Sequence, residues 1–170
     1  MTRYVALLRG VNVGGVNVKM VDLAEVVRGL GYDDVKTVLA SGNVLFTTTD
    51  SPATAKEALE HALRARFGYE AWVHVLTQAT IRGIVDAYPF ARSAERHAYV
   101  VFILKSEVRD ELLAVELDPS VEQAEAGDGV IYWSTPKGST LDSAMGKAQG
   151  SGRHKQWLTT RNLNTLEKLL

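Results

Sequence analysis

The chain has 170 residues, of which 46% are hydrophobic and 23% charged, with a formal net charge of −1 and no cysteine. A chain of this length buries enough surface to fold without a disulfide or a structural metal. The absence of cysteine excludes disulfide scaffolds, iron–sulfur clusters, thiolate zinc sites and cysteine nucleophiles, and it is compatible with a reducing, cytoplasmic location. No apolar run reaches the roughly 20 residues of a membrane span.

The first part of the chain predicts alternating strands and helices. Short segments rich in β-branched and aromatic residues predict strands at residues 4–9, 35–40, 44–49 and 70–76. Apolar residues three or four positions apart predict a helix after residue 20 and another after Ser51-Pro52, a favourable cap and first helical position. The order β-α-β-β-α-β is that of ferredoxin-like folds.

The second part repeats this order less clearly. A linking helix is expected between a cap at Thr77 and a stop at Pro89. Strands are then expected at residues 98–104, 121–126, 130–134 and 156–160. Helices are expected after an N-cap at Ser106, near 140–148 and over 162–170. We therefore expect an α+β fold of two ferredoxin-like β-α-β-β-α-β halves, joined by the linking helix and closed by a C-terminal helix. The halves, residues 1–76 and 77–170, would form one compact globular unit.

The near-zero net charge conceals a segregation of charge along the chain. Residues 1–20 hold three bases and no acid, residues 100–128 hold two bases and eight acids, and residues 129–170 hold six bases and two acids. One interpretation is a set of solvated faces that differ in charge. The other is that the two basic ends share a surface that attracts anions.

A glycine-rich loop between the first strand and the first helix is the most informative segment. It runs from Arg9 to Lys19 and contains Gly10, Gly14 and Gly15. Glycines let backbone amides approach a ligand closely, and helix N-termini attract anions. Val16-Asn17 stands where a phosphate-binding P-loop has Lys-Ser or Lys-Thr, which excludes nucleotide hydrolysis of that type. The alternative is a tight turn in which asparagines bond the backbone locally.

A second polar segment, Ser41-Gly42-Asn43, lies between two predicted strands and is most simply a hairpin turn. In a ferredoxin-like sheet, the first two strands both lie antiparallel beside the third. Their C-terminal ends therefore point to the same edge, and the loop and the hairpin should be neighbours. That edge would offer a ligand the side chains of Arg9, Asn12, Asn17, Ser41 and Asn43.

The segment Thr160-Arg161-Asn162 opens the last predicted helix, with Thr160 or Asn162 as its N-cap. The simplest interpretation is a capped helix that packs on the core. A basic residue at a helix N-terminus is not favoured by the helix dipole, so Arg161 would have an anion or a carboxylate as its partner.

Other motifs are excluded. The histidines lack the spacing of zinc ligands, and neither a metal nor a cofactor is expected. Ser134 and Lys137 match the S-x-x-K string of serine acyl-enzymes, but this serine ends a strand rather than beginning a helix, so we interpret the match as chance. The third predicted strand lacks the aromatic signature of RNA-recognition domains.

Three stretches resemble a bacterial family of unknown function, DUF 1697. YVALLRGVNVGG at 4–15, ASGNVLF at 40–46 and TTRNLNTLEKL at 159–169 are similar to its opening, hairpin and closing segments. The resemblance implies two ferredoxin-like halves and no particular activity. The family pattern falls on Arg9, Gly10, Asn12, Gly14, Gly15, Ser41, Gly42, Asn43, Thr160, Arg161, Asn162, Thr165 and Lys168. Leu163 replaces a tryptophan of the family, which removes an aromatic ring that could stack on a ligand.

Three functions remain open at this point. The first is a cytoplasmic protein that binds a small phosphate-bearing anion or a nucleic-acid backbone, without a membrane partner. Its expected ligand-binding residues are Arg9, Gly10, Asn12, Gly14, Gly15, Asn17, Ser41, Asn43, Arg161 and Asn162. The second is a structural or oligomeric protein whose motif residues only hold turns and caps. The third is an enzyme that uses the same edge, disfavoured because the three segments contain no His, Asp or Glu except Glu167.

Overall fold

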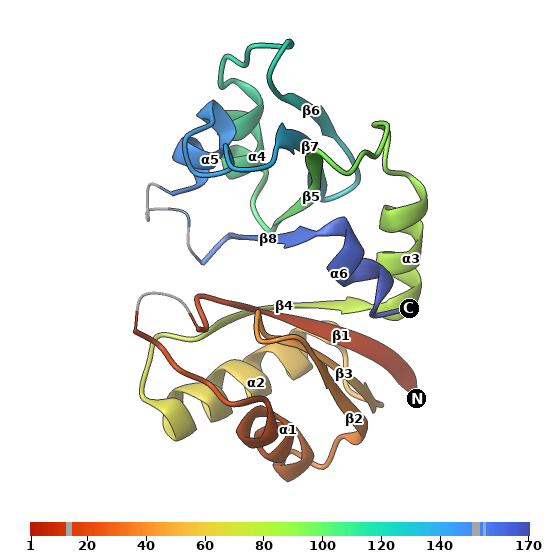
Figure 1. Cartoon of the computed structure of the whole chain (residues 1–170). Coiled ribbons are helices and arrows are strands. Elements are labelled where there is room, and N and C mark those ends of the chain that lie inside the picture. The colour runs from red at the N-terminus through yellow and green to blue at the C-terminus, as the bar shows by residue number, and fades with distance from the viewer. Residues whose placement is uncertain (13–14, 151–153, 155) are drawn as a thin grey trace. The chain divides into compact units, whose positions relative to one another are not determined.

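The computed structural model describes residues 1–12, 15–150, 154 and 156–170 (Figure 1). It divides into two compact units, and each contains a four-stranded antiparallel sheet with helices packed on it. The first unit is Met1–Arg82 with Lys168–Leu170, and the second is Gly83–Glu167. The fold is therefore mixed α+β. Its described part has no helix that is both long and apolar enough to cross a membrane.

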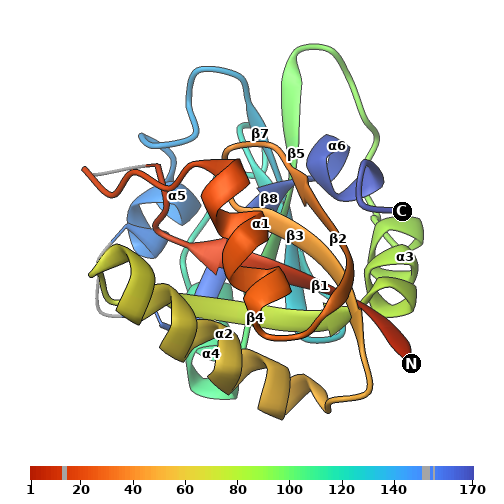
Figure 2. The same cartoon turned by 90° about the horizontal axis from the view of Figure 1, so that it is seen from below.

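The first unit follows the predicted order of elements. They are β1 (Thr2–Arg9), α1 (Met20–Gly29), β2 (Asp33–Val38), β3 (Asn43–Thr48), α2 (Pro52–Phe67) and β4 (Trp72–Thr77). The strands are arranged in the order β2-β3-β1-β4, and every neighbouring pair is antiparallel. Figure 2 shows α1 and α2 side by side across one face of this sheet. Alternate residues of β1, including Tyr4 and Leu8, face these helices and join Phe46, Leu59 and Leu63 in a buried core.

The ends of the two helices show why the chain folds as predicted here. Ser51 Oγ accepts a hydrogen bond from the backbone N–H of Thr54 at 3.2 Å, and Pro52 occupies the first helical position of α2. Gly68 ends α2 with φ +66°, and Gly31 follows α1 with φ +83°. Both glycines adopt the left-handed backbone that other residues avoid, which is the conformation that commonly ends a helix.

The second unit begins inside α3 (Gln78–Asp86) and continues to Glu167. Its further elements are β5 (Arg96–Ile103), α4 (Ser106–Leu113), β6 (Gln123–Ala126), β7 (Val130–Pro136), α5 (Ala144–Gln149), β8 (Leu158–Asn162) and α6 (Leu163–Glu167). The strand order is β6-β7-β5-β8, again antiparallel throughout. Val108 and Leu112 of α4 and Met145 of α5 pack on the face of this sheet that carries Ile131 and Trp133.

A buried carboxylate positions α5 over this core. Glu122 accepts hydrogen bonds from Trp133 Nε1 and from the backbone N–H of Ala144, each at 3.0 Å, and from the backbone N–H of Met145 at 3.4 Å. A carboxylate at the first turn of a helix complements the helix dipole. Glu122 therefore joins β6, β7 and α5.

Two local predictions were wrong. Ser106 is the first residue of α4 rather than its cap, and Lys105 occupies the cap position with no side-chain hydrogen bond. The last helix is shorter than the predicted 162–170, because α6 ends at Glu167. Asn162, one of the two candidate caps, accepts the backbone N–H of Asn164 on its Oδ1 at 2.9 Å.

Candidate functional site

The glycine-rich loop and the hairpin lie side by side in the first unit, as their topology predicts. The backbone N–H of Leu8 donates to the carbonyl of Gly42 at 2.8 Å. Asn12 Nδ2 donates to the carbonyls of Ala40 at 2.6 Å and Val18 at 3.1 Å, and Asn12 Oδ1 accepts the N–H of Val18 at 3.0 Å. The Asn12 amide therefore holds the loop closed and fastens it to the hairpin.

The hairpin turn between β2 and β3 is held in a similar way. Asn43 has no exposed surface, and its Nδ2 donates to the carbonyl of Val38 at 2.8 Å and to Ser41 Oγ at 2.9 Å. Gly42 has φ +88°, and a Cβ added there would lie 2.5 Å from Val11 Cγ2. The turn thus packs directly against the glycine-rich loop, and its polar groups bond the backbone around it.

The remaining predicted residues of this edge have fewer interactions. Arg9 ends β1 opposite Trp72 of β4, and its Nε is buried with no hydrogen-bond partner among the described residues. Burial lowers the pKa of the Arg9 guanidinium. Gly10 and Gly15 have φ +76° and +90°, with open space where a Cβ would be, and Asn17 is exposed. Gly14 lies outside the described residues.

The two predicted residues of the closing segment, Arg161 and Asn162, belong to β8 of the second unit. Arg161 is 6% exposed, and its Nη1 donates to Thr159 Oγ1 at 2.7 Å and to the carbonyl of Thr160 at 3.1 Å. Asn162 lines a pocket of the second unit that no motif had indicated.

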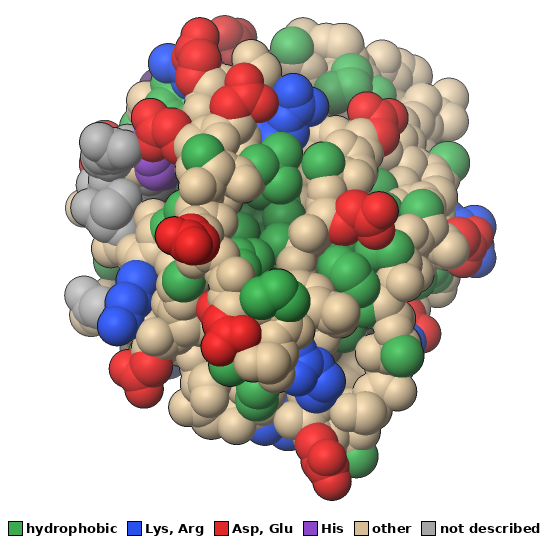
Figure 3. Space-filling view, turned by 90° about the horizontal axis from the view of Figure 1, so that it is seen from above, with side chains coloured by type: hydrophobic (Ala, Val, Ile, Leu, Met, Phe, Trp, Pro, Cys, Tyr) green, Lys and Arg blue, Asp and Glu red, His purple; other side chains and the backbone are tan. Residues whose placement is uncertain are grey.

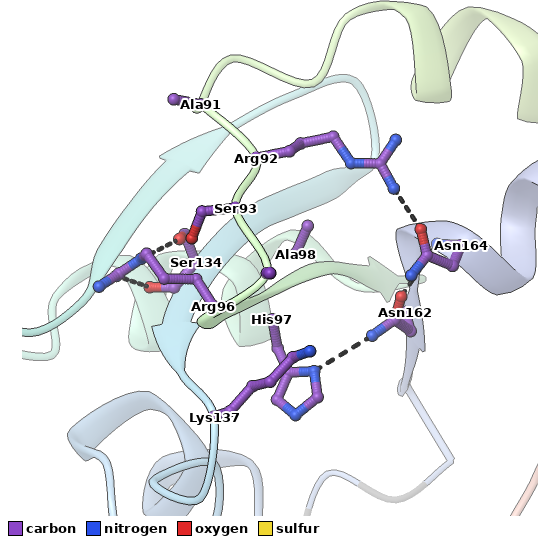
Figure 4. Close-up of a pocket in the computed structure, with 11 residues that line it drawn as sticks. Ala91, Arg92, Ser93, Arg96, His97, Ala98, Ser134, Lys137, Asn162 and Asn164 are labelled. Carbon is purple, nitrogen blue, oxygen red and sulfur yellow. Dashed lines mark hydrogen bonds between the residues drawn. The ribbon is translucent and has the colours of Figure 1, made fainter.

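That pocket has a volume of about 420 Å³ and lies where the segment before β5, the end of β7 and the junction of β8 with α6 meet (Figure 4). Three cations, one imidazole, two amides, two hydroxyls and three alanine methyls line it, and no carboxylate does. The lining residues are Ala91, Arg92, Ser93, Ala94, Arg96, His97, Ala98, Ser134, Lys137, Asn162 and Asn164.

The cations of the pocket are held in different ways. Arg96 Nε donates to Ser134 Oγ at 2.9 Å, and its Nη2 donates to the carbonyls of Val121 at 2.8 Å and Ser134 at 3.1 Å. Neutral oxygens therefore fix the Arg96 guanidinium without neutralising its charge. Lys137 is exposed beyond the end of β7, and no described residue serves its ammonium as a partner.

Arg92 is the third cation and the only one with a carboxylate partner in the described part of the chain. Its Nη1 lies 2.8 Å from Glu167 Oε1, and its Nη2 donates to Asn164 Oδ1. Asn162 Nδ2 lies 3.4 Å from His97 Nδ1, so the amide can donate to that ring nitrogen. Asn162 thus links β8 to the start of β5, and Asn164 links α6 to the segment before β5, as Figure 4 shows.

The positive charges of Arg92 and Arg96 influence the pKa of Tyr88. Burial raises the pKa of Tyr88, while a hydrogen bond with Ser134 and the charges of Arg92 and Arg96 act in the opposite direction. Both guanidinium groups therefore favour the phenolate form of Tyr88.

Positive charge is not general to the second unit. Figure 3 shows a face on which Asp and Glu side chains are scattered around a hollow with hydrophobic side chains at its floor. The acidic segment 100–128 contributes α4 and β6 to this unit. The described part of the chain holds no group of three His, Asp or Glu side chains that could bind a metal ion.

Sequence reasoning missed most of this pocket. Arg92 lies in the connection after Pro89, and Arg96 and His97 begin β5. None of the three belongs to a motif, and Lys137 was noticed only in a chance S-x-x-K string. A usable signal was present, because three basic or imidazole side chains fall within six residues before a predicted strand. The register of β5 with β7 places Arg96 opposite Pro136, next to Lys137.

Comparison with known proteins agrees with the resemblance of the three segments. A family model described as a protein of unknown function (DUF1697) matches residues 1–132. The chain belongs to this family. The match to DUF1697 includes the glycine-rich loop, the hairpin, Arg92, Arg96 and His97, and it ends before Lys137 and the closing segment.

One solved structure similar to this DUF1697 chain is that of the conserved bacterial protein SP0830 from Streptococcus pneumoniae. The two are 26% identical with a TM-score of 0.82, and the alignment covers 99% of this chain and 96% of the other. No functionally curated protein matches the chain. The comparisons therefore give the family and the fold, and they indicate no specific function.

Proposed function

We propose that this DUF1697 protein binds a small phosphate-bearing anion in the pocket of its second unit. One observation carries the proposal: three cations, two within residues 92–96 and one just after β7, line a pocket of about 420 Å³ that no carboxylate lines. Pockets of this size hold small-molecule ligands, and a few polar groups placed around them give specificity. Guanidinium groups bind phosphate oxygens in forked geometry, and an ammonium adds a point charge.

The uncharged side chains that line the pocket indicate which groups the ligand carries besides its phosphate. Asn162 and Asn164 can exchange hydrogen bonds with hydroxyl or carbonyl groups. The methyl groups of Ala91, Ala94 and Ala98 form an apolar wall for a short carbon skeleton. A small phosphorylated metabolite has both features. The pocket is concave and contained in one unit, which favours such a molecule over a nucleic-acid backbone, whose phosphates bind along an extended basic surface.

A second candidate site is the edge of the first unit formed by the loop 9–19 and the hairpin 41–43. Arg9 supports it, because its buried Nε has no partner in the described part of the chain. Gly10 and Gly15 support it as well, since the space beside both is open. The side chains of Asn12 and Asn43 instead bond the backbone, so a ligand there would be bound by Arg9 and by amides of the loop.

We also infer that each unit is a ferredoxin-like half. The β-α-β-β-α-β order of β1 to β4, the same order of β5 to β8 with α4 and α5, and the antiparallel strand orders support this inference. The site of the second unit would then lie at the N-terminal end of that half's first strand, β5.

The proposal is tested by titrating the protein with methyl phosphate and following backbone amide signals by NMR. Lys137→Gln removes a pocket charge whose loss disturbs no described contact, and we expect it to weaken binding about 10- to 100-fold, as for a hydrogen bond to a charged group. Lys147→Gln is the matched control, because Lys147 is exposed on α5 and does not line the pocket. We expect its affinity to stay within about twofold of the unchanged protein.

Three results would contradict the proposal. Methyl phosphate could fail to shift any signal of the pocket residues. Lys137→Gln and Lys147→Gln could bind equally. Short single-stranded RNA could bind while methyl phosphate does not, which would identify a nucleic-acid partner instead. Shifts confined to Arg9, Gly10 and Gly15 would place the site at the edge of the first unit.

A further inference from the structure

One cation of the pocket is paired with a carboxylate of the chain itself. Arg92 lines the pocket, but its Nη1 is bound to Glu167 Oε1 at 2.8 Å, and Glu167 is not a lining residue. Asn164 lies one helical turn before Glu167 and accepts a hydrogen bond from Nη2 of the same guanidinium. Figure 4 shows the Arg92 side chain extended toward Asn164, at the wall formed by α6.

This arrangement distinguishes Arg92 from the other two cations. Arg96 donates only to a hydroxyl and two carbonyls, and Lys137 has no partner among the described residues. A ligand with one negative charge therefore finds two cations available without breaking any ion pair. A ligand with two negative charges can also bind the third cation, Arg92, but only when it displaces Glu167 from the guanidinium.

The Arg92–Glu167 pair is easily exchanged. Both side chains are 44% exposed, and ion pairs between exposed side chains contribute little to stability because water and salt screen them. A phosphate dianion between three cations is a stronger partner for the guanidinium than one exposed carboxylate, since it offers forked hydrogen bonds and a higher charge. Arg92 already lines the pocket that the ligand would occupy.

We propose that Glu167 is an internal competitor that holds Arg92 until a phosphate dianion replaces it, and that Arg92 thereby selects monoesters over monoanions. This inference rests on the proposed anion-binding function. It narrows the ligand class to phosphate monoesters, because phosphodiesters and carboxylates carry one charge and gain too little to displace Glu167.

The experiment compares five proteins: the unchanged chain, Glu167→Gln, Arg92→Gln, the double variant and Glu95→Gln. Glu95 is exposed and precedes Arg96, but it does not line the pocket, so Glu95→Gln removes the same charge nearby and serves as the matched control. Methyl phosphate at pH 8 is the dianionic probe and dimethyl phosphate the monoanionic one. Affinities come from NMR titration, and melting temperatures check that every variant is folded.

We expect Glu167→Gln to bind methyl phosphate about 3- to 10-fold more tightly, the size expected from removal of an exposed ion pair. Glu95→Gln should change the affinity by less than about twofold. Arg92→Gln should weaken methyl phosphate binding and leave dimethyl phosphate binding unchanged. In the double variant the gain from Glu167→Gln should disappear, since the carboxylate acts through Arg92.

The outcomes separate this inference from the proposed function. If Lys137→Gln weakens binding but Glu167→Gln binds no more tightly than Glu95→Gln, the pocket binds anions and Glu167 only fastens α6, so the inference is wrong. If Glu167→Gln still increases the affinity for methyl phosphate when Arg92 is also replaced, the carboxylate does not act through Arg92, and the inference is again wrong. If no variant binds methyl phosphate, the proposed function is wrong and the inference is rejected with it.

Discussion

The edge of the first unit and the pocket of the second unit differ in how their polar side chains are used. At the edge, the amides of Asn12 and Asn43 bond backbone groups of the loop and the hairpin. In the pocket, Arg96 meets only neutral oxygens and Lys137 meets no described partner. The asparagines of the edge thus hold the backbone of the loop and the hairpin. Arg96 and Lys137 instead keep a positive charge that no described carboxylate neutralises, and such a charge can bind an anionic ligand.

The difference has a physical origin in the backbone of the first unit. Asn12 has φ +56°, Leu39 has φ +61° and Gly42 has φ +88°, so the loop and the hairpin contain several residues in the left-handed region. Such residues cost free energy unless glycine occupies the position or the surrounding bonds compensate. The side-chain amides supply those bonds, which is why they are not free to bind a ligand.

The largest effect is expected at Gly42. Gly42→Ala places a Cβ 2.5 Å from Val11 Cγ2 and 2.9 Å from Leu8 Cβ, on a backbone with φ +88°. Left-handed strain and overpacking together should lower the free energy of unfolding by about 2–5 kcal/mol. Urea denaturation measures the change.

Gly31→Ala is the control for strain without a clash, because Gly31 has φ +83° and nothing within 4 Å of an added Cβ. Its cost should be about 1–2 kcal/mol. Equal losses for the two variants would show that the hairpin does not pack tightly on the loop. The edge of the first unit would then not be held by close packing, and its difference from the pocket would not be structural.

The next effect is expected at Asn12, where the edge is predicted to be structural. Asn12→Ala removes two donated hydrogen bonds and one accepted bond, so it should lower the free energy of unfolding by about 1–3 kcal/mol. The affinity for methyl phosphate should not change. Both quantities can be measured on the same preparation by urea denaturation and NMR titration.

Asn17→Ala is the matched control in the same loop. Asn17 is exposed, and no described residue accepts or donates a hydrogen bond to its side chain. We expect a change within about 0.5 kcal/mol. If Asn12→Ala abolishes methyl phosphate binding while the protein remains folded, the ligand binds at the edge, and the roles assigned to the two regions must be exchanged.

Much of the fold was predictable because it depends on local pattern. The apolar run of β1, the Ser51-Pro52 start of α2 and the left-handed glycines Gly31 and Gly68 are properties of neighbouring residues. The adjacency of loop and hairpin followed from strand direction alone. Hydrophobic periodicity does not identify the residue that caps a helix. Lys105 occupies the cap position of α4 without making a side-chain hydrogen bond there.

The hydrogen-bond and ion-pair partners of the polar side chains were harder to predict, because these partners are distant in sequence. Asn12 meets Ala40, and Arg92 meets Glu167, contacts that only the folded sheet and helix positions create. The pocket itself depends on the register of β5 with β7, which brings the segment before Arg96 next to Lys137. Sequence therefore predicted that the loop and the hairpin are neighbours, but it placed Asn162 at the opening of a helix rather than at the end of β8 beside a pocket.

The smallest effect concerns Tyr88, which reports the charge of the pocket. The positive charges of Arg92 and Arg96 act against the burial that raises the pKa of this phenol, because they favour the phenolate. Arg92→Gln removes one of them and should raise the pKa of Tyr88 further. NMR of ¹³C-labelled tyrosine, followed as the pH is raised, measures the change.

Tyr32 and Tyr69 of the first unit are the internal controls. Burial raises the pKa of each to about 12, for Tyr32 together with a hydrogen bond to Asp50, and none of these causes involves the pocket. Both should titrate identically in the unchanged protein and in Arg92→Gln. A pKa of Tyr88 that does not respond would mean that the guanidinium charge is already neutralised by Glu167. The pocket would then present two effective cations, and Arg92 would belong with Asn12 among the residues whose partners lie within the fold.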